Sequence, residues 1–462
     1  MSVRRSAGTV FWGLTLVSIG GLLLARNLGY PIPIWSQIAR YWPALLIAWG
    51  VLKFVDYYRF RSAGDNRPLF SGGEVALLIL MIIAGSALTT ASNISPDLGN
   101  IFHIGDLDLW DITGNNFSYD EHREEAVPSG STIQIINLYG NVEVRPSESD
   151  RVVLDVNKTV RAANREEADR LSGDFTFQIK NEGTTYKVVS NRDDFSGTGN
   201  VRGERQRFKS SLTIQVPKES ALIIDNRNGR VVVQDLRGQQ TIANRYGEVD
   251  IRGITGEVRI ENRNGSVSIQ DVTESVTVNN SYAPTTAKSI GGNLEIHNRN
   301  GAVDVSDVKG NATISNSYAP ISIEKVQGEV TVTGRNNGLD IDDVQGDLKA
   351  ESSYQNVSIR DARGSVSLNS RNGDLSLTFE RPPEKDITIS NRYGNVRLEL
   401  PSTSSFRIDS RTEYGNTNSE FDGIESAKTS NREAVLRGRV GQGGPLITIT
   451  TRNGDIHLDK RS

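Results

Sequence analysis

The segment from Ala221 to Gly373 alternates apolar and polar positions in seventeen consecutive units of about nine residues. In most units the second and fourth residues are apolar and β-branched, with polar residues between them, which is typical of a short strand buried on one face. Gly or Ala usually closes the unit, and Gly readily adopts the positive φ that a tight turn needs. One ten-residue unit is followed by an eight-residue unit, so the register is kept. The pattern predicts a repeat of strand, corner, strand, corner.

Two kinds of unit alternate, so each kind recurs at every second unit. One kind ends in Asn-x-(Asn or Tyr)-(Gly or Ala), at Asn226, Asn244, Asn262, Asn280, Asn298 and Asn316. The other kind carries a third apolar residue near its end, at Leu236, Ile254, Val272, Ile290, Val308 and Val326. A short fixed period without helices is typical of coils that create a core only when they stack. The predicted fold is mainly β, a single-stranded β-solenoid with about 18 residues and two strands per coil.

Stacked coils would place the Asn series in one column at one corner and the aliphatic series in a column at the other. Asn suits a corner because its amide bonds the local backbone, tolerates the left-handed conformation and can bond a stacked amide. Alternate coils carry a tyrosine where the others have Asn228, Asn264 and Asn300, namely Tyr246, Tyr282, Tyr318 and Tyr354. A 36-residue coil of four strands would explain the tyrosines equally well, and it stays open.

Three apolar stretches precede the repeats and predict a transmembrane region of three helices over residues 1–92, at about 6–25, 41–58 and 75–92. A cleaved signal peptide is the alternative for the first stretch, but two more apolar stretches follow it, which favours a membrane anchor. Lys and Arg mark cytoplasmic ends. The N-terminus is therefore expected in the cytoplasm and the C-terminal domain outside, from Arg4, Arg5, Lys53, Arg59, Arg61 and Arg67, against Arg26 and Arg40.

Changes in composition divide the rest of the chain. The expected parts are a polar linker at 93–130, a β-rich N-terminal cap at 131–217 and a β-solenoid repeat domain at 218–462. Within the cap we expect a short helix at 161–171 and a mobile loop at 191–206. Beyond Gly373 the units lengthen, and a terminal coil is expected to end near Leu458.

Composition and motifs argue against catalysis. The 462-residue chain has no cysteine and a formal net charge of −4 of mixed sign, which excludes disulfides and Cys-ligated zinc and disfavours nucleic acid as a partner. We find neither a phosphate loop nor a nucleophile elbow. The histidines lack metal-pair spacing, at His103, His122, His297 and His457. The prediction is no enzyme, no metal and no cofactor.

A regular series of aspartates also has two interpretations. Calcium-binding β-rolls combine nine-residue repeats with paired glycines and a regular Asp. Here the paired glycines are missing, although an Asp recurs in every fourth unit, at Asp235, Asp271, Asp307 and Asp343. We interpret these aspartates as corner caps.

An arginine stands next to the Asn and Tyr corner positions in many coils. With coils about 4.8 Å apart, guanidinium groups and tyrosine rings could form a strip that holds an anionic or sugar polymer by bidentate hydrogen bonds and stacking. The alternative is solvated turn residues, with the arginines offset by Glu248, Glu257 and Asp250. The candidate ligand-binding strip comprises Arg227, Arg245, Tyr246, Arg263, Tyr282, Arg299, Tyr318, Arg335, Tyr354 and Arg371.

Two stretches resemble known families. FWGLTLVSIGGLLLARNLG followed by YWPALLIAWGVL, a Gly-punctuated pair with Trp-Pro before its second part, resembles the membrane region of Lia-type envelope-stress proteins of bacteria over residues 8–58. SLTIQVPKESALIIDNRNGRVVVQDLRG and the repeats after it resemble the "putative adhesin" family of bacterial β-strand repeat proteins over most of 131–460. The resemblance implies a cell-envelope solenoid with an adhesive or ligand-binding role, and it carries no catalytic residues.

Together these observations predict a multi-pass cell-membrane protein with an extracytoplasmic, adhesin-like solenoid that binds a cell-envelope polymer or protein. The expected partners are the lipid bilayer and that envelope ligand. One alternative is envelope-stress sensing or signalling, with the solenoid as sensor or docking rod. Another is a scaffold in which solenoids self-associate end to end.

Overall fold

The computed structural model describes residues 115–162, 164–192, 208–429 and 432–461. The chain divides into two units, Met1–Asp111 and Ile112–Ser462. The first unit lies outside the described residues, and so do the three expected membrane spans and all but the first two residues of the loop expected at 191–206. No helix in the described ranges is long and apolar enough to cross a membrane. These ranges hold strands and one helix, α4 (Arg165–Asp174), which confirms the mainly β prediction.

The first sheet, called sheet A, has sixteen strands. In spatial order they are β1 (Asn115–Ala126), β4 (Arg151–Ala162), β7 (Phe208–Pro217), β3 (Val142–Ser147), β9 (Val231–Gln234), β11 (Val249–Ile254), β13 (Val267–Val272), β15 (Thr285–Ile290), β17 (Val303–Val308), β19 (Ile321–Val326), β21 (Leu339–Val344), β23 (Val357–Ala362), β25 (Leu375–Thr378), β27 (Val396–Pro401), β33 (Ile456–Arg461) and β29 (Thr417–Ser419).

The second sheet, called sheet B, faces sheet A. Its strands, in the order of their pairing, are β5 (Phe177–Glu182), β6 (Thr185–Ser190), β2 (Thr132–Tyr139), β8 (Ala221–Asn228), β10 (Gln240–Tyr246), β12 (Val258–Glu261), β14 (Val276–Asn279), β16 (Leu294–His297), β18 (Ala312–Asn316), β20 (Val330–Gly334), β22 (Leu348–Ser352), β24 (Val366–Ser370), β26 (Ile387–Tyr393), β32 (Leu446–Asn453), β28 (Phe406–Tyr414), β31 (Ala434–Val440) and β30 (Ile424–Lys428).

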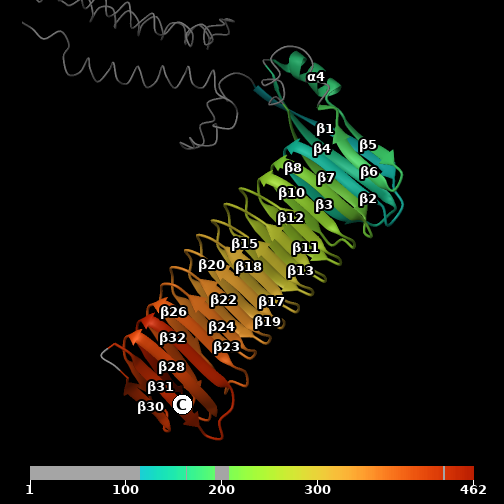
Figure 1. Cartoon of the computed structure of the whole chain (residues 1–462). Helices are drawn as coiled ribbons and strands as arrows, with labels where there is room; N and C mark the ends of the chain where they lie inside the picture. The colour runs from blue at the N-terminus through green and yellow to red at the C-terminus, as the bar shows by residue number, and fades with distance from the viewer. Residues whose placement is uncertain (1–114, 163, 193–207, 430–431, 462) are drawn as a thin grey trace, which may run out of the picture. The chain divides into compact units, whose positions relative to one another are not determined.

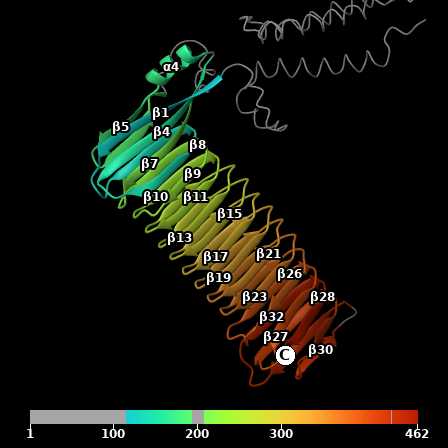
Figure 2. The ribbon, with the colours of Figure 1, turned by 180° about the vertical axis from the view of Figure 1, so that it is seen from behind.

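The register of these sheets sets the length of a coil. Gln240 of β10 pairs in parallel with Val258 of β12, so each strand meets the second strand after it in sequence. Asn226 and Asn244, which share a hydrogen bond across neighbouring coils, are likewise 18 residues apart. The chain alternates between the sheets, and the coils stack one after another (Figure 1, Figure 2). The predicted coil of two strands and about 18 residues is confirmed, and the 36-residue coil is wrong.

Inward side chains of both sheets form one continuous core. In β11, for example, Val249 and Ile251 are fully buried, and Ile242 of β10 is 1% exposed. The third apolar residue of alternate units closes the core at the corner after each sheet A strand, and the whole predicted series is 0–1% exposed: Leu236, Ile254, Val272, Ile290, Val308 and Val326. Each coil thus buries its apolar surface only against its neighbours, as expected of a solenoid.

A residue in the left-handed backbone conformation recurs at that same corner. The predicted capping aspartates hold it, with φ of 54° at Asp235 and 57° at Asp271, because Asp tolerates this region better than most residues. Ser289 takes the position with φ 58°. The full series is Asp235, Gly253, Asp271, Ser289, Asp307, Lys325, Asp343 and Asp361. The aspartates therefore occupy a position that the turn geometry requires.

Replacing Ser289 by Gly is expected to stabilise the protein by about 0.5 kcal/mol, because Gly removes the strain of a left-handed residue. The matched control is Ser268→Gly in β13, where the backbone is extended. There the lost conformational entropy should destabilise the protein by about 0.5–1 kcal/mol. Urea unfolding of both variants measures the two shifts, and shifts of the same sign would contradict the expectation.

Antiparallel strands close both ends of the described unit. At the N-terminal end β4 pairs antiparallel with β1 and β7, and Lys158 of β4 links the layers. Its buried Nζ donates to the carbonyls of Ser172 and Phe175 at 2.8 Å and lies 3.1 Å from the Glu121 carboxylate of β1. At the C-terminal end β31 pairs antiparallel with β28 and β30. Antiparallel strands therefore cover both ends of the stack, and the cap expected at 131–217 remains a prediction.

Two expectations near the N-terminal end need correction. From residue 115 the segment expected as a polar linker is the edge strand β1, whose Phe117 and Tyr119 pack on the core, whose Glu121 meets buried Lys158, and whose other residues are exposed. The helix expected at 161–171 begins four residues later, because β4 continues to Ala162 and Asn164 caps the helix by accepting from Glu167 N at 2.9 Å. β2 and β3 of the expected cap pair directly with β8 and β9 of the repeats, so the two parts form continuous sheets. The boundary between them therefore remains a prediction.

The prediction that the last unit in sequence, ending near Leu458, is the terminal coil of the stack is wrong. Units do lengthen beyond Gly373, because Val366 pairs with Ile387, three positions beyond the spacing of the inner coils. However, Ile447 of β32 pairs with both Ile387 of β26 and Ile408 of β28, so the last unit in sequence lies inside the stack. The outer coil comes from β28 and β29. Sequence spacing cannot show this order, because the chain reverses through β30 and β31 before it returns.

Candidate functional site

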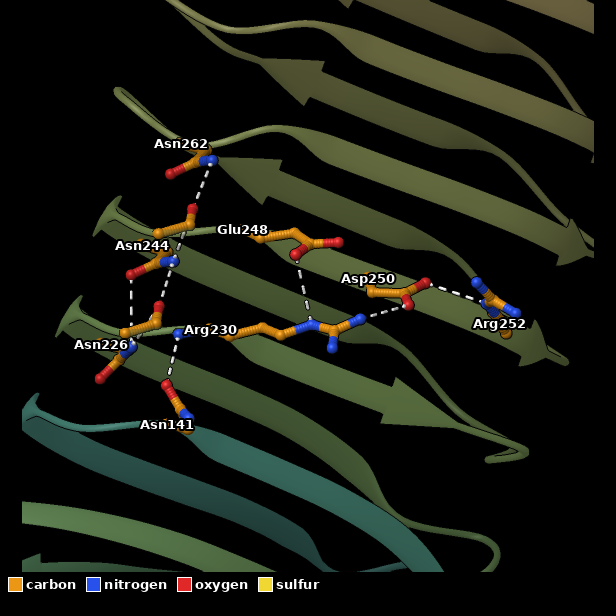
Figure 3. A network of polar contacts seen from close by, with 10 residues as sticks. Asn141, Asn226, Arg230, Asn244, Glu248, Asp250, Arg252 and Asn262 are labelled. Atoms are coloured by element: carbon orange, nitrogen blue, oxygen red, sulfur yellow. Dashed lines mark hydrogen bonds and ion pairs between the residues drawn. The ribbon is translucent and has the colours of Figure 1, made fainter.

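A column of buried Asn side chains fixes the corner at which many of the sheet B strands end. Asn244 Nδ2 donates to the Gly247 carbonyl of its own corner at 3.1 Å and to the Gly229 carbonyl of the preceding corner at 3.0 Å (Figure 3). Asn262 repeats this with Gly265 at 2.7 Å and Gly247 at 3.1 Å. The same pattern recurs at Asn280, Asn298, Asn316 and Asn391. Each amide thus links two successive coils through their backbones.

The ten-residue unit changes how this column is filled. Gly334 stands where the preceding coil carries Asn316, and the Asn337 amide oxygen would lie 2.2 Å from a Cβ placed on it. Asn337 is 2% exposed and donates from Nδ2 to the Asn316 carbonyl at 3.3 Å. The extra residue therefore supplies the amide from the far side of the corner, and Gly334 leaves the space for it.

Because the Asn side chain points inward, the next residue along the strand points outward. All six arginines of the candidate strip are exposed: Arg227, Arg245, Arg263, Arg299, Arg335 and Arg371. The tyrosines stand one residue further along. Tyr282 is 49% exposed, Tyr318 55% and Tyr354 53%, whereas Tyr246 is half-buried. The structure therefore brings the predicted residues to one corner of the solenoid.

The alternation of Tyr and Asn runs further than the sequence spacing showed. Asn228 pairs with both Tyr139 and Tyr246, and Asn453 pairs with both Tyr393 and Tyr414. The candidate strip left out Tyr139, Tyr393 and Tyr414 because insertions separate them from the 36-residue spacing. Their signal was the Tyr-Gly pair that ends each corner. Along the whole corner the order is Tyr139, Asn228, Tyr246, Asn264, Tyr282, Asn300, Tyr318, Asn336, Tyr354, Asn372, Tyr393, Asn453 and Tyr414.

The strip arginines differ from other arginines in their charge partners. In the described part of the chain none of the six forms an ion pair. Arg230 lies 3.4 Å from Glu248 and 3.1 Å from Asp250, and Arg252 lies 3.0 Å from Asp250 (Figure 3). Glu248 and Asp250, expected to offset the strip, thus pair with arginines on the outer face of sheet A. The strip keeps its positive charge available.

Two hollows open on the outer face of sheet B beside this corner. One, of about 560 Å³, is lined by Arg263, Ser281 and His297, among others. The second, of about 310 Å³, is lined by Arg335, Ser353 and Arg371, among others. Each hollow lies where a Ser replaces Arg in the row that precedes the Tyr and Asn positions. From Arg263 to Arg371 the row therefore alternates between arginines and gaps.

The side chains at the strip provide binding groups rather than a nucleophile with its base. Arginines offer forked donors and positive charge, and tyrosines offer ring faces. Nearby His297 lies 2.8 Å from a Glu295 oxygen and 2.7 Å from Ser315 Oγ. Within the described ranges no group of three or more His, Asp and Glu side chains is placed to hold a metal ion. The geometry suits a ligand held along the corner.

Two family models match the sequence. The model described as Toastrack DUF4097 matches residues 131–459. The model of the LiaF transmembrane domain matches residues 11–104. The first range covers the repeat region and the second covers the apolar N-terminal region. Together they support a membrane protein of the cell envelope.

Two curated relatives match a short part of the chain. They are the inner membrane-spanning protein YciB of Neisseria meningitidis serogroup A and that of serogroup B, each 30% identical over 92 residues, which is 19% of this chain. The chain spans about half of these relatives, 52% of their length. The match adds a second likeness to a membrane protein.

Two solved structures are also similar. A "putative cell adhesion protein" from Clostridium sporogenes is 8% identical, with 74% of this chain and all of that chain covered (100%) and a TM-score of 0.15. A "putative adhesin" from Bacteroides fragilis is 10% identical, with 74% and 97% covered and a TM-score of 0.19. Scores this low carry no argument about this chain.

Proposed function

This chain belongs to the Toastrack DUF4097 family, and from that premise we propose that it is a membrane-anchored, non-enzymatic binding protein whose solenoid lies outside the cytoplasm. Its ligand is a cell-envelope polymer that lies along the candidate strip. The match of residues 11–104 to the LiaF transmembrane domain supports the anchor. The distribution of Lys and Arg around the apolar stretches supports an N-terminus in the cytoplasm, three spans and an external C-terminal domain.

One observation supports a polymer as the ligand: the same binding groups repeat in successive coils along one corner. Arg245 and Arg263 stand one coil apart, exposed and without ion pairs in the described residues. A compact ligand would need one such position, whereas a linear polymer contacts many at once and gains affinity from each. Arg suits carboxylate or phosphate because its fork donates two parallel hydrogen bonds.

The closed ends of the solenoid argue against the scaffold hypothesis. Antiparallel strands cover both ends of the stack, and the last strand of sheet A at the C-terminal end, β29, has only three residues. Short edges and covering strands are the usual means by which proteins prevent edge-to-edge association. End-to-end stacking of solenoids is therefore disfavoured.

Envelope-stress sensing is the second candidate, and the LiaF transmembrane match favours it. In that function the solenoid would be a sensor or a docking rod, and the membrane region would pass on the signal. The strip would then contact a protein of the envelope. A folded chain that binds no envelope polymer would favour this function.

The test is binding of the full chain, in lipid nanodiscs, to immobilised glycan strands, polyol phosphates and lipopolysaccharide. Arg245→Ala combined with Arg263→Ala is expected to weaken binding about tenfold or more, because two charged hydrogen-bond forks are lost. Both residues are exposed, so the melting temperature should stay within about 2 °C of wild type.

The matched control removes two exposed arginines that do form ion pairs, Arg237 with Glu219 at 3.0 Å and Arg397 with Asp459 at 3.3 Å. The variant Arg237→Ala with Arg397→Ala has the same net charge as the strip variant and should bind within about twofold of wild type. Equal weakening by both variants would show that charge alone, and not the strip, holds the polymer.

A further inference from the structure

Between Arg263 and Asn372 the corner repeats every two coils rather than every coil. Units ending in Arg-Asn alternate with units ending in Ser-Tyr over seven successive coils. The residues at the first of these two positions are Arg263, Ser281, Arg299, Ser317, Arg335, Ser353 and Arg371. The residues at the second are Asn264, Tyr282, Asn300, Tyr318, Asn336, Tyr354 and Asn372. At these corner positions, arginine and tyrosine therefore never stand in the same coil of this segment.

This alternation has a fixed length. Paired strands lie about 4.8 Å apart, so arginines recur about every 9.6 Å along the solenoid, and tyrosines recur at the same interval, one coil out of step. Two of the gaps between arginines open into hollows, which are lined by Ser281 and Ser353. A ligand that uses every position must therefore repeat after two units, each about as long as one coil.

Extended β-1,4-linked glycans have such a repeat. Each pyranose ring advances the chain by about the rise of one coil, ~4.8 Å, and successive rings are turned over, so the same face returns at every second ring. Tyrosine rings one coil pair apart can then stack on the same face of alternate sugars, as aromatic side chains do with apolar ring faces. A helical α-linked glycan lacks this straight two-ring repeat.

The arginines indicate in addition that the ligand carries negative charge. They recur once per repeat and form no ion pair in the described residues. Ser stands at the intervening positions and adds no charge there, while Glu261 and Glu351, which line the hollows beside Ser281 and Ser353, each pair with a cation of their own strand. A guanidinium group binds a carboxylate through two parallel hydrogen bonds. We infer that the ligand is a β-1,4-linked glycan with a carboxylate on every second sugar, lying along the seven-coil segment from Arg263 to Asn372. This inference rests on the proposed function.

The experiment measures binding of the full chain in nanodiscs to oligomers of defined length. The main probe alternates N-acetylglucosamine and N-acetylmuramic acid through β-1,4 links, with free lactyl carboxylates. Its eight-sugar oligomer is expected to bind on the order of 100-fold tighter than the disaccharide, because further contacts on one rigid strip act together. Neutral chitin octamer should bind about tenfold more weakly, and the difference should shrink at high salt. Affinity that does not change with length would overturn the inference.

Two further probes test the repeat itself. An α-1,4-linked galacturonate octamer carries carboxylates on a helical chain that lacks the straight two-ring repeat, and it should not bind measurably. A β-1,4-linked glucuronate octamer carries one on every sugar and should bind about tenfold more weakly than the main probe. Ser317→Arg fills a gap between Arg299 and Arg335, and it should reverse this preference by favouring the glucuronate octamer. Unchanged preference, or equal binding of α- and β-linked octamers, would overturn the two-coil match.

The tyrosine contribution has its own variant and control. Tyr282→Ala, Tyr318→Ala and Tyr354→Ala together should weaken octamer binding on the order of 100-fold. Tyr414→Ala, at the same corner but outside the seven coils, should change it less than about threefold. Binding of another envelope polymer through Arg245 and Arg263, with none of these glycans bound, would overturn this inference and leave the proposed function standing. No binding to any polymer would overturn both.

Discussion

Val249→Asp is expected to destabilise the solenoid by about 4 kcal/mol or more, because it places an unpaired carboxylate in the core. Val249 is fully buried, and its register neighbours are Val231 in the preceding coil and Val267 in the next. None of these side chains offers a donor to a buried anion. Thermal melting of the full chain in detergent, followed by the β-sheet circular dichroism, measures the loss.

The matched control places the same new carboxylate on the outer face of sheet A. Gln270 of β13 lies between Arg252 and Lys288 in register, so Gln270→Asp should stay within about 0.5 kcal/mol of wild type. Hydrogen exchange should show early opening of β9, β11 and β13 in Val249→Asp only, since a solenoid loses stability locally. If Val249→Asp melted like wild type, its inward assignment would be wrong.

The repeat segment shows how far a periodic sequence can predict a fold. Alternation along each unit assigned inward residues such as Val249, and the two-unit spacing gave the register of Gln240 with Val258. Every coil provides an independent copy of the same signal, so one irregular unit, at Gly334, does not hide it. The choice between an 18-residue and a 36-residue coil needed the structure, because Tyr and Asn share one corner position.

Prediction failed where strand order departs from sequence order. The sequence of β32, LITITTRN, has the same pattern as the inner strands, and nothing in it shows that it lies between β26 and β28. Likewise β1 is mostly polar, since the only apolar side chains with which this edge strand packs on the core are Phe117 and Tyr119. Long-range pairing of this kind depends on loop connections that local periodicity does not encode.

The candidate strip was predictable as a set of positions but not as an arrangement. The motif showed which residues share a corner, whereas the absence of ion pairs around Arg245 in the described residues depends on where Glu248 and Asp250 point. Glu248 precedes β11 and Asp250 lies within it, both close to Arg245 in sequence, yet they contact Arg230 and Arg252 on the side of sheet A (Figure 3). Closeness in sequence therefore led to the wrong expectation that these acids neutralise the positive charge of the strip.

Asn262→Asp is expected to destabilise the solenoid by about 3–4 kcal/mol at neutral pH, although it changes only an amide nitrogen to an oxygen. Asn262 is 6% exposed, and its Nδ2 donates to the carbonyls of Gly265 at 2.7 Å and Gly247 at 3.1 Å. A carboxylate there loses both hydrogen bonds and faces two carbonyl oxygens at short range. Urea unfolding against wild type measures the loss.

The loss should depend on pH with a definite sign. In the folded variant, burial and the two carbonyl oxygens raise the pKa of the new carboxyl above its unfolded value of about 3.9. The deficit is therefore complete above the folded pKa and shrinks as pH falls towards the unfolded value, because protonation restores one donor. Asn264→Asp, exposed at the same corner, should show neither the deficit nor this dependence. An equal deficit at pH 4 and pH 8 would mean that lost hydrogen bonds, and not buried charge, govern the column.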